Sequence, residues 1–300
     1  MLRRGCIEHD TCFPPNRTLV FIGDSLTRYQ YLDLVYSLHF GNHDFARRNK
    51  QNPLSAPSFR TWLDFLNHTT SALRPNEACD CYRAGRSVTF RPDRISENRL
   101  YSSSGCDDGD ANASSCGTSS TRIAFFNAFG SAPISGHFPL RGSIWNWTPE
   151  SPVLSASSWN QSLWQHQHWE DFISTVVTRL RATAVVLNAG FHQADGLDLE
   201  RIRQASAAAA ECVVWKTATP ARPDEAGKSA ESRRVAALEL RARQAFARDI
   251  VFETGPLLQR QLNWSEHLYT DSFHFAPASN AYHLLNKGLL RALEERCGAW

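Results

Sequence analysis

Three residues near the two ends of the chain have the types that nucleophilic acyl chemistry requires. Ser25 ends the segment LVFIGDS (19–25), where an apolar run meets a helical pattern. Asp271 and His274 are three positions apart in TDSFH (270–274), a spacing that places both side chains on one face of a turn or first helical turn. A serine hydroxyl becomes reactive when an adjacent imidazole removes its proton and a carboxylate orients that imidazole. The three residues form a candidate Ser-His-Asp triad.

Each part of this triad also has a simpler structural interpretation. Gly-Asp-Ser is equally a strand-to-helix turn in which Asp24 or Ser25 caps the helix. An isolated D-x-x-H pair is more often a surface aspartate beside a core histidine. Two features favour catalysis: Ser25 precedes a helix, whose N–H groups and dipole favour a developing oxyanion, and His274 follows the last expected strand. Loops at the carboxyl ends of strands are where open α/β sheets hold their ligands.

Further candidates flank these positions. The segment AVVLNAGFHQ (184–193) is a strand pattern running into Asn188, whose side-chain amide is able to donate to an oxyanion. A plain turn is the alternative, since Asn and Gly favour left-handed conformations. Asp24 is expected to tie down the turn before Ser25 by hydrogen bonds. Arg28, one helical turn beyond Ser25, is either an anchor of the site through an ion pair or a surface residue.

The elements expected to position these residues alternate between strand and helix. Short apolar runs predict strands at 19–24, 123–126, 184–187, 212–216 and 250–252. Apolar positions at helical spacing predict helices at 26–39, 168–181, 197–210, 229–247 and about 279–295. This alternation predicts an α/β fold with a parallel sheet covered on both faces. We expect a single domain over residues 1–300, with irregular insertions at about 41–120 and 131–167.

Composition argues against two classes of partner. The net charge is +2, and arginine, which outnumbers lysine 28 to 4, is interleaved with acidic residues, so no nucleic-acid partner is expected. No apolar run reaches the roughly 18 residues of a spanning helix, and no apolar signal core opens the chain. Taken alone, this favours a cytoplasmic protein; any membrane anchor would lie outside this chain.

Cysteines and glycosylation sequons favour the secretory pathway instead. The eight cysteines lie mostly in polar sequence, where disulfides are useful, and Cys106 with Cys116 would close a local loop. Zinc is the alternative, but Cys79-Asp-Cys81 has one intervening residue and no matching second pair. Chance predicts about two N-x-S/T sequons, and six are present. They begin at Asn16, Asn67, Asn112, Asn146, Asn160 and Asn263. We therefore expect a glycoprotein with disulfides in an oxidising compartment of the secretory pathway.

Aromatic and histidine residues are concentrated in the segment before the third expected strand, 184–187. Five tryptophans lie in 145–169 and are candidates for stacking on sugar rings, with packing under long loops as the alternative. They are Trp145, Trp147, Trp159, Trp164 and Trp169. His166-Gln-His168 has a spacing that binds metal on a strand, but no carboxylate companion is evident. No metal site is expected.

The order of these segments resembles the SGNH (GDSL) hydrolase superfamily. More narrowly, GDSLTRYQ (23–30) is similar to the G-D-S-L-x-R-x-Q block of the PC-esterase group, which includes the plant trichome-birefringence-like proteins. VVWKTATP (213–220) resembles that group's strand and Thr-x-x-Pro turn, and LNAGFH (187–192) its Asn-x-Gly block. The similarity spans about residues 19–290 as scattered blocks, with little in the long middle segment.

The resemblance implies a three-layer, flavodoxin-like α/β/α fold with disulfide-linked insertions, and a setting in the Golgi lumen or outside the cell. It also implies a nucleophile, a general base and an orienting carboxylate, which by position are Ser25, His274 and Asp271. The oxyanion hole would combine the Ser25 backbone N–H with Asn188. Its glycine donor has no clear match, and the candidate is Gly130 in FFNAFGS (125–131).

Around the Asn-x-Gly block the resemblance also implies supporting or substrate-binding roles for Gly190 and His192. The plant group's aromatic pair is absent there, because Phe191-His192 follows instead. The activity implied is acetyl transfer from an unidentified acyl donor to a hydroxyl of a polysaccharide or glycan, through a Ser25 acyl-enzyme and without a cofactor. If water is the acceptor, the same triad makes an O-acetyl or carboxyl esterase. A third hypothesis is a catalytically silent glycan-binding protein.

Overall fold

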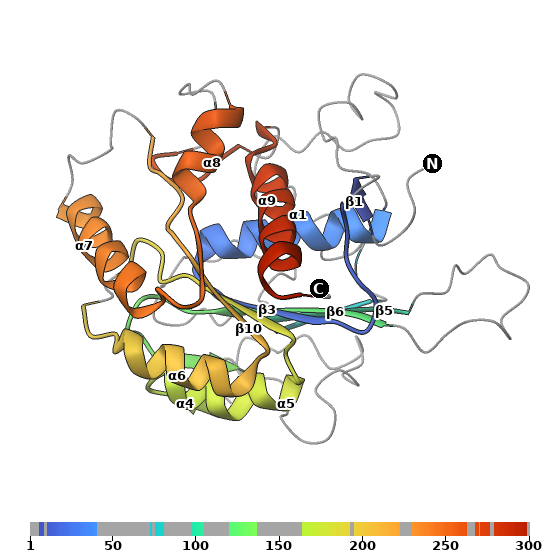
Figure 1. Cartoon of the computed structure of the whole chain (residues 1–300), viewed down its shortest axis with the longest axis horizontal. Helices are drawn as coiled ribbons and strands as arrows, with labels where there is room; N and C mark the ends of the chain where they lie inside the picture. Colours follow the sequence, from blue (N-terminus) through green and yellow to red (C-terminus); the bar gives the residue numbers. More distant parts are fainter. Residues whose placement is uncertain are drawn as a thin grey trace, which may run out of the picture.

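A seven-stranded sheet runs through the middle of the protein in the computed structural model (Figure 1). The structure describes residues 6–8, 11–40, 73, 76–80, 98–104, 120–136, 164–192, 195–222, 230–262, 268–269, 271–276 and 279–298. In spatial order the strands are β11 (Ile250–Phe252), β10 (Cys212–Lys216), β9 (Ala184–Leu187), β3 (Thr18–Gly23), β6 (Ser120–Asn127), β5 (Asn98–Ser104) and β4 (Glu77–Asp80). Those from β11 to β6 pair in parallel, while β5 is antiparallel to β6 and β4 to β5.

The central strands are buried on both faces, which explains their apolar sequences. Along β3, Leu19 and Phe21 belong to one hydrophobic core, and Val20 and Ile22 to the other. A parallel strand covered by helices on both faces needs apolar side chains at every position. The five predicted strands are all present in the sheet.

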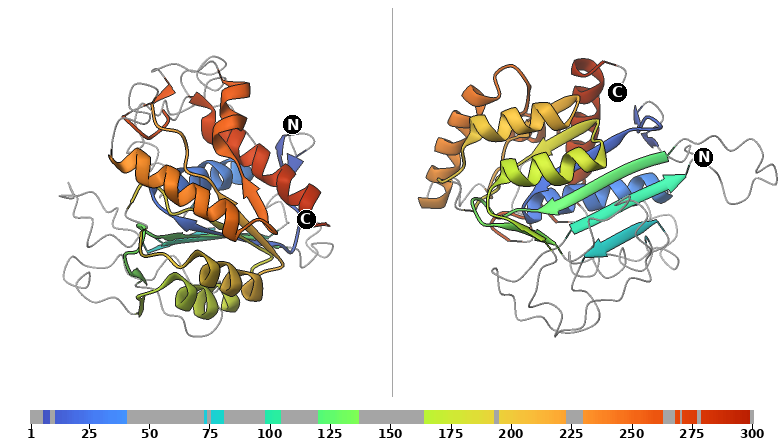
Figure 2. Two further views of the ribbon diagram at one scale, coloured as in Figure 1. Left: turned by 60° about the vertical axis from the view of Figure 1, so that its left-hand side comes forward. Right: turned by 90° about the horizontal axis from the view of Figure 1, so that it is seen from below.

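Helices cover the two faces in separate layers. Above the sheet in Figure 1 lie α1 (Ser25–Phe40), α8 (Thr254–Gln261) and α9 (Ala281–Arg296). The other core is closed by α4 (Trp169–Phe172), the π-helical turn η5 (Ile173–Val177), α5 (Thr178–Leu180), α6 (Leu199–Ala209) and α7 (Ala230–Ala245). The predicted α/β architecture, with a mostly parallel sheet between helices, is confirmed. Figure 2 shows the same layers from two other directions.

The segments expected to be irregular contain some regular structure. β4 and β5 come from the 41–120 segment and extend the sheet at one edge. β7 (Ile134–Gly136) pairs with β8 (Trp164–His166), and β1 (Cys6–Glu8) with β2 (Thr11–Cys12), as two small antiparallel pairs. Within the segments expected to be irregular, the structure therefore has the strands β4, β5, β7 and β8, whereas β1 and β2 precede both segments. Most of the two segments lies outside the described residues, including Cys106, Cys116, Trp145, Trp147 and Trp159.

A disulfide fastens the C-terminal end of the chain to the sheet. It joins Cys212, the first residue of β10, to Cys297, directly after α9, across 85 residues. Closing a loop of this length in the unfolded chain is worth about 4.5 kcal/mol in the chain-entropy model. The sequence left the pairing of these two cysteines open. In the part of the chain that the structure describes, no helix is long and apolar enough to cross a membrane.

Candidate active site

Ser25 lies where the strand order reverses. In the sheet β3 lies between β6 and β9. The chain passes from β3 to β6 on one side and then returns to β9 on the other side, so the direction of strand addition reverses at β3. α1, which follows β3, packs into one core, and α6, which follows β9, packs into the other. The segments that leave these adjacent strands therefore diverge. Ligands of open α/β sheets bind at such a switch point, outside the carboxyl ends of the strands.

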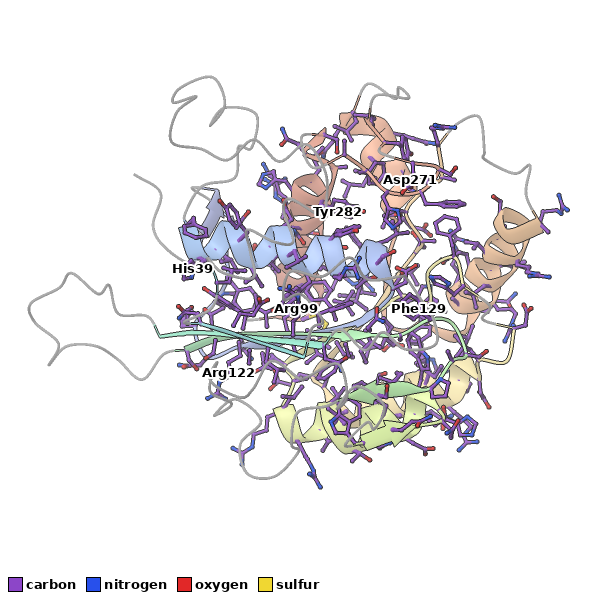
Figure 3. The ribbon with its side chains drawn as sticks, turned by 180° about the vertical axis from the view of Figure 1, so that it is seen from behind. His39, Arg99, Arg122, Phe129, Asp271 and Tyr282 are labelled. Carbon is purple, nitrogen blue, oxygen red and sulfur yellow. A yellow bond between two sulfur atoms is a disulfide. The ribbon has the colours of Figure 1, made fainter. Side chains whose placement is uncertain are left out.

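The three residues of the predicted triad meet at this end of the sheet. Ser25 Oγ is 2.7 Å from His274 Nε2, and His274 Nδ1 is 2.7 Å from Asp271 Oδ2. Ser25 is the first residue of α1 and is partly exposed. In Figure 3, Asp271 lies on the same side of the molecule as Phe129, which follows β6, whereas Arg122, near the start of β6, lies on the opposite side. The triad predicted from residue types is thus assembled from segments 249 positions apart.

Asp271 is held by its own loop. Its Oδ1 accepts hydrogen bonds from the backbone N–H groups of Phe273 (2.9 Å) and His274 (2.8 Å). Partial burial raises the pKa of Asp271, but the hydrogen bonds from His274 and Phe273 and the charge of His274 outweigh it and lower that pKa to about 2. The carboxylate is therefore ionised at neutral pH and keeps a proton on Nδ1, so that Nε2 acts as acceptor for the Ser25 hydroxyl.

The imidazole of His274 packs against α1, the helix that begins at Ser25. Tyr29, one turn beyond Ser25 on α1, meets it edge to face with ring centroids 5.4 Å apart. On the other side, Tyr29 contacts Tyr282 of α9 at 6.1 Å. Arg28 donates to the Tyr29 hydroxyl at 3.1 Å, and its guanidinium lies 4.8 Å from the Tyr29 ring centroid. Arg28 thus acts on the site through Tyr29. Sequence reasoning missed Tyr29, although its spacing of four from Ser25 was a usable signal.

The loop that carries Asp271 and His274 is tied to the loop after β10. The Tyr269 hydroxyl donates to the Pro220 carbonyl at 3.1 Å, and Arg222 N–H donates to the Ser272 carbonyl at 2.9 Å. Tyr269 and Phe275 form a β-bridge that closes the base of the triad loop. These bonds fix a segment that has no helix or strand of its own.

Asp24 joins the turn at Ser25 to the loop after β9. It is 1% exposed and accepts hydrogen bonds from the backbone N–H groups of Leu26 (3.0 Å) and Phe191 (3.4 Å). Gly190 has φ +66°, and a Cβ at that position would overlap the Asp24 carboxylate. Gly190 is therefore required both by its backbone conformation and by this close approach. The expected structural role of Asp24 agrees with these contacts.

The side chain of Asn188 is turned into the protein. It is 0% exposed, its Nδ2 donates to the Lys216 carbonyl at 2.9 Å, and its Oδ1 accepts from Thr27 Oγ1 at 3.2 Å. This arrangement differs from the oxyanion role expected for Asn188, because the amide is engaged between β9, β10 and α1. The structure instead gives Asn188 a part in holding the start of α1.

Gly130 and His192 lie in loops next to the triad. Gly130 follows β6, has φ +54°, and its carbonyl accepts from Trp169 Nε1 at 2.9 Å. His192 is exposed and meets the ring of Phe129 at 4.6 Å. Beside them, Phe191 contacts Phe273 of the triad loop at 4.4 Å. Two aromatic contacts, Phe129 with His192 and Phe191 with Phe273, therefore border the site. Neither contact was predicted from the sequence.

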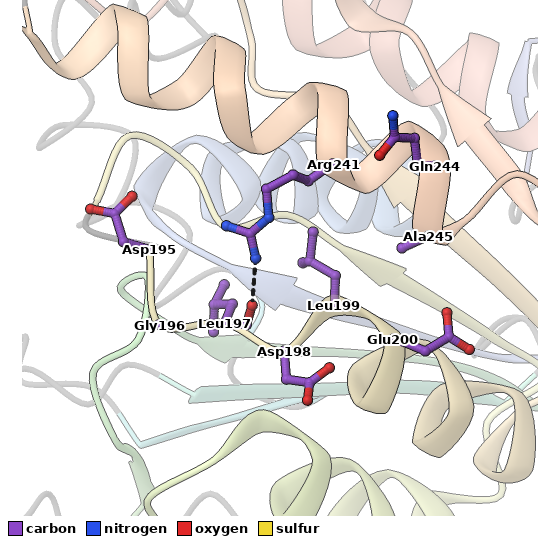
Figure 4. Close-up of a pocket in the computed structure, with 9 residues that line it drawn as sticks. All are labelled: Asp195, Gly196, Leu197, Asp198, Leu199, Glu200, Arg241, Gln244 and Ala245. Atoms are coloured by element: carbon purple, nitrogen blue, oxygen red, sulfur yellow. Dashed lines mark hydrogen bonds between the residues drawn. The ribbon is translucent and has the colours of Figure 1, made fainter.

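Two further features, a surface hollow and a partly buried histidine, do not involve the triad residues. An open hollow of about 640 Å³ is lined by the loop before α6 and by α7, and in it Arg241 donates to the Leu197 carbonyl at 2.9 Å (Figure 4). His166 lies in β8, where burial lowers its pKa. Within the described ranges, no group of three or more His, Cys, Asp or Glu side chains is arranged to hold a metal ion.

Comparison with known proteins gives no family to which this chain belongs: no protein-family model matches it, and no curated protein is significantly similar to it.

Proposed function

We propose that the protein is a serine acyl-transfer enzyme of the SGNH type that moves acetyl groups. The observation that carries the proposal is the chain of two 2.7 Å contacts from Ser25 through His274 to Asp271, placed at the switch point of the sheet. Numbered along the chain, the parallel strands stand in the order 2-1-3-4-5, which is that of flavodoxin-like sheets and supports the same assignment.

The geometry supports a two-step exchange. In the first step His274 Nε2 takes the proton of Ser25 Oγ as the oxygen attacks the carbonyl carbon of an acetyl ester. The tetrahedral intermediate collapses to an acetyl-Ser25 ester, and the donor's alcohol leaves with the proton from His274. In the second step His274 takes the proton of an acceptor hydroxyl as that oxygen attacks the acetyl carbon, and His274 then gives the proton to Ser25 Oγ as the bond from Ser25 to the acetyl carbon breaks.

The negative charge on the intermediate requires hydrogen-bond donors near Ser25. Since Asn188 faces the interior, we assign this role to the Ser25 backbone N–H at the start of α1, where the helix dipole also favours an anion. Gly130, in the loop after β6, is the candidate for a second donor.

A polysaccharide or glycan hydroxyl is the proposed acceptor. The aromatic contacts of Phe191 with Phe273 and of Phe129 with His192 border the site and offer ring faces for a sugar. A secretory-pathway setting agrees with the disulfide between Cys212 and Cys297 and with the exposed position of Asn16 in its sequon.

An esterase that passes the acetyl group to water is the second candidate. It is favoured by the openness of the triad, because the side chain of Asp271 is 54% exposed and that of His274 is 25% exposed. A transferase must keep water from the acyl-enzyme, so the degree of closure around Ser25 during the reaction decides between the two activities.

The test uses a fluorophosphonate probe and a chromogenic acetate ester. Wild type should label and turn over, whereas Ser25→Ala should do neither, and equal behaviour of the two proteins refutes the assignment of Ser25. Addition of a deacetylated oligosaccharide should then yield a product heavier by one acetyl group. Release of acetate alone, with no acetylated sugar, rejects the transferase in favour of the esterase.

A further inference from the structure

Lys216 is a buried lysine behind the nucleophile turn. It is the last residue of β10, it follows three apolar residues in CVVWK, and it is 0% exposed. Removing an ammonium group from water is costly unless other groups compensate for its charge. None of the three residues of the triad contacts Lys216 in the hydrogen bonds described above, so the proposed chemistry leaves its presence unexplained.

The polar contacts of Lys216 form a closed set with two neighbours. Its Nζ lies 3.5 Å from Thr27 Oγ1, and Thr27 donates from that oxygen to Asn188 Oδ1 at 3.2 Å. Asn188 Nδ2 in turn donates to the Lys216 carbonyl at 2.9 Å. All three residues are 0% exposed. The set therefore connects the end of β10, the loop after β9 and the first turn of α1, two residues beyond Ser25.

Two acidic residues supply the compensating charge. Asp24, which precedes the nucleophile, and Glu239 of α7 both attract the Lys216 ammonium, and they are 1% and 7% exposed. Burial lowers the pKa of Lys216 to about 8, although the charges of Asp24 and Glu239 raise it. Glu239 has partners of its own, since it accepts from Trp215 Nε1 at 3.1 Å and from Ala218 N–H at 2.7 Å. In the hydrogen bonds described here Asp24 is bound by backbone N–H groups, and the Lys216 ammonium is a buried side-chain cation that attracts its carboxylate.

We propose that Lys216 is a positioning residue for the nucleophile: its ammonium offsets the buried charge of Asp24 and holds Thr27, which keeps Ser25 in place against His274. The inference rests on the proposed function, because it assigns Lys216 a part in the reactivity of Ser25. A cation beside the first turn of α1 interacts unfavourably with the positive end of the helix dipole. Stabilisation of α1 therefore does not explain why Lys216 is present. We therefore place the effect of Lys216 on the turn that contains Asp24 and Ser25.

The first experiment compares Lys216→Met, which keeps the length of the side chain without its charge, with Lys287→Met, at a half-buried position of α9, as a matched control. The rate of fluorophosphonate labelling and the kcat and KM for an acetate ester are measured, with melting curves to verify folding. We expect Lys216→Met to lower labelling and kcat by about 10- to 100-fold with little change in KM. Lys287→Met should behave like wild type. A folded Lys216→Met protein that labels at the wild-type rate overturns the proposal.

A second experiment distinguishes positioning from a general loss of stability. If Lys216 compensates for Asp24, the double variant Lys216→Met/Asp24→Asn should label faster than Lys216→Met alone, because neither buried charge is then left unpaired. Wild type should also lose labelling rate as the pH rises through about 8, where Lys216 gives up its proton, and Lys216→Met should lack this decline. Asp24 and Glu239 are the acidic groups whose charges act on the ammonium. A slower double variant overturns the proposal.

The design holds even if Lys216→Met fails to fold. In that case wild type alone carries the test, and a labelling rate that does not fall between pH 7 and 10 overturns the proposal. The failures of the two proposals are also distinguishable. If wild type and Ser25→Ala do not differ, the proposed function fails; if they differ but Lys216 has no effect, only the present inference fails.

Discussion

Replacing Asp271 by Asn tests the triad at its most exposed member. In the folded chain the carboxylate accepts three hydrogen bonds, two from backbone N–H groups of its own loop and one from His274 Nδ1. An asparagine keeps one oxygen for the backbone but turns an NH₂ group toward Nδ1. The imidazole is then favoured with its proton on Nε2, the tautomer that does not accept the proton of Ser25. The variant should fold and lose activity.

Two magnitudes follow from the environment of Asp271. Loss of the correct tautomer costs about 10⁴-fold in kcat where the aspartate is buried. Here the side chain is 54% exposed, and water competes for Nδ1, so we expect a loss of about 10²- to 10³-fold. The lowering of the Asp271 pKa from 3.8 to about 2 would correspond to about 2.5 kcal/mol, which solvent screening reduces to about 1 kcal/mol.

The pH dependence of that stability has a definite sign. The folded-state pKa is depressed, so the contribution is fully present above about pH 4 and is lost as the pH falls from 3.8 toward 2. At pH 7 the variant should therefore melt about 2–4 °C lower than wild type, a small change beside the loss of kcat.

The assay measures fluorophosphonate labelling and steady-state ester turnover at pH 7, with melting curves from pH 2 to 7. Asp195→Asn, an exposed aspartate outside the triad, is the matched control and should keep full activity. If Asp271→Asn retains half or more of the wild-type kcat while Asp195→Asn behaves normally, Asp271 does not orient His274.

Two more predictions concern the supports of the site. Gly190→Ala should destabilise the protein by about 2–4 kcal/mol and slow labelling more than tenfold, because φ is +66° and the new Cβ overlaps Asp24. Gly255→Ala, where nothing lies within 4 Å of a new Cβ, is its control, and similar melting temperatures for both variants would contradict the prediction. Cys212→Ser/Cys297→Ser should lower the free energy of unfolding by about 4.5 kcal/mol, measured by denaturant titration against non-reduced wild type. Peptide mapping of non-reduced protein that finds both thiols unlinked would contradict this pairing.

The part of the fold predicted from sequence is the part set by apolar patterning. β3 and β9 are continuous apolar runs because both faces of the sheet are covered. The strand β5 was missed because it contains Arg99, which is 0% exposed and pairs with Glu77 of β4 at 2.6 Å. Tyr31 of α1 also donates to Glu77 at 2.9 Å. A charged residue in NRLYSSS indicates a loop when its partner, 22 positions away, is unknown.

The same limit applies to the candidate site. The sequence indicated which residues lie there better than it indicated where their side chains point. The meeting of Ser25, Asp271 and His274 follows from strand ends, since parallel strands place their following loops at one edge of the sheet. The direction of the Asn188 side chain is set by the Lys216 carbonyl, 28 residues further along the chain, and no spacing rule contains that information. Burial of Lys216 is equally hidden, because CVVWK could end in solvent. What identifies Lys216 is the acidic residue it faces, Asp24, which a strand-to-helix turn would otherwise present to water. Two of the buried charges, those of Arg99 and Lys216, therefore interact with acidic residues on distant segments, and hydropathy alone does not indicate such pairs.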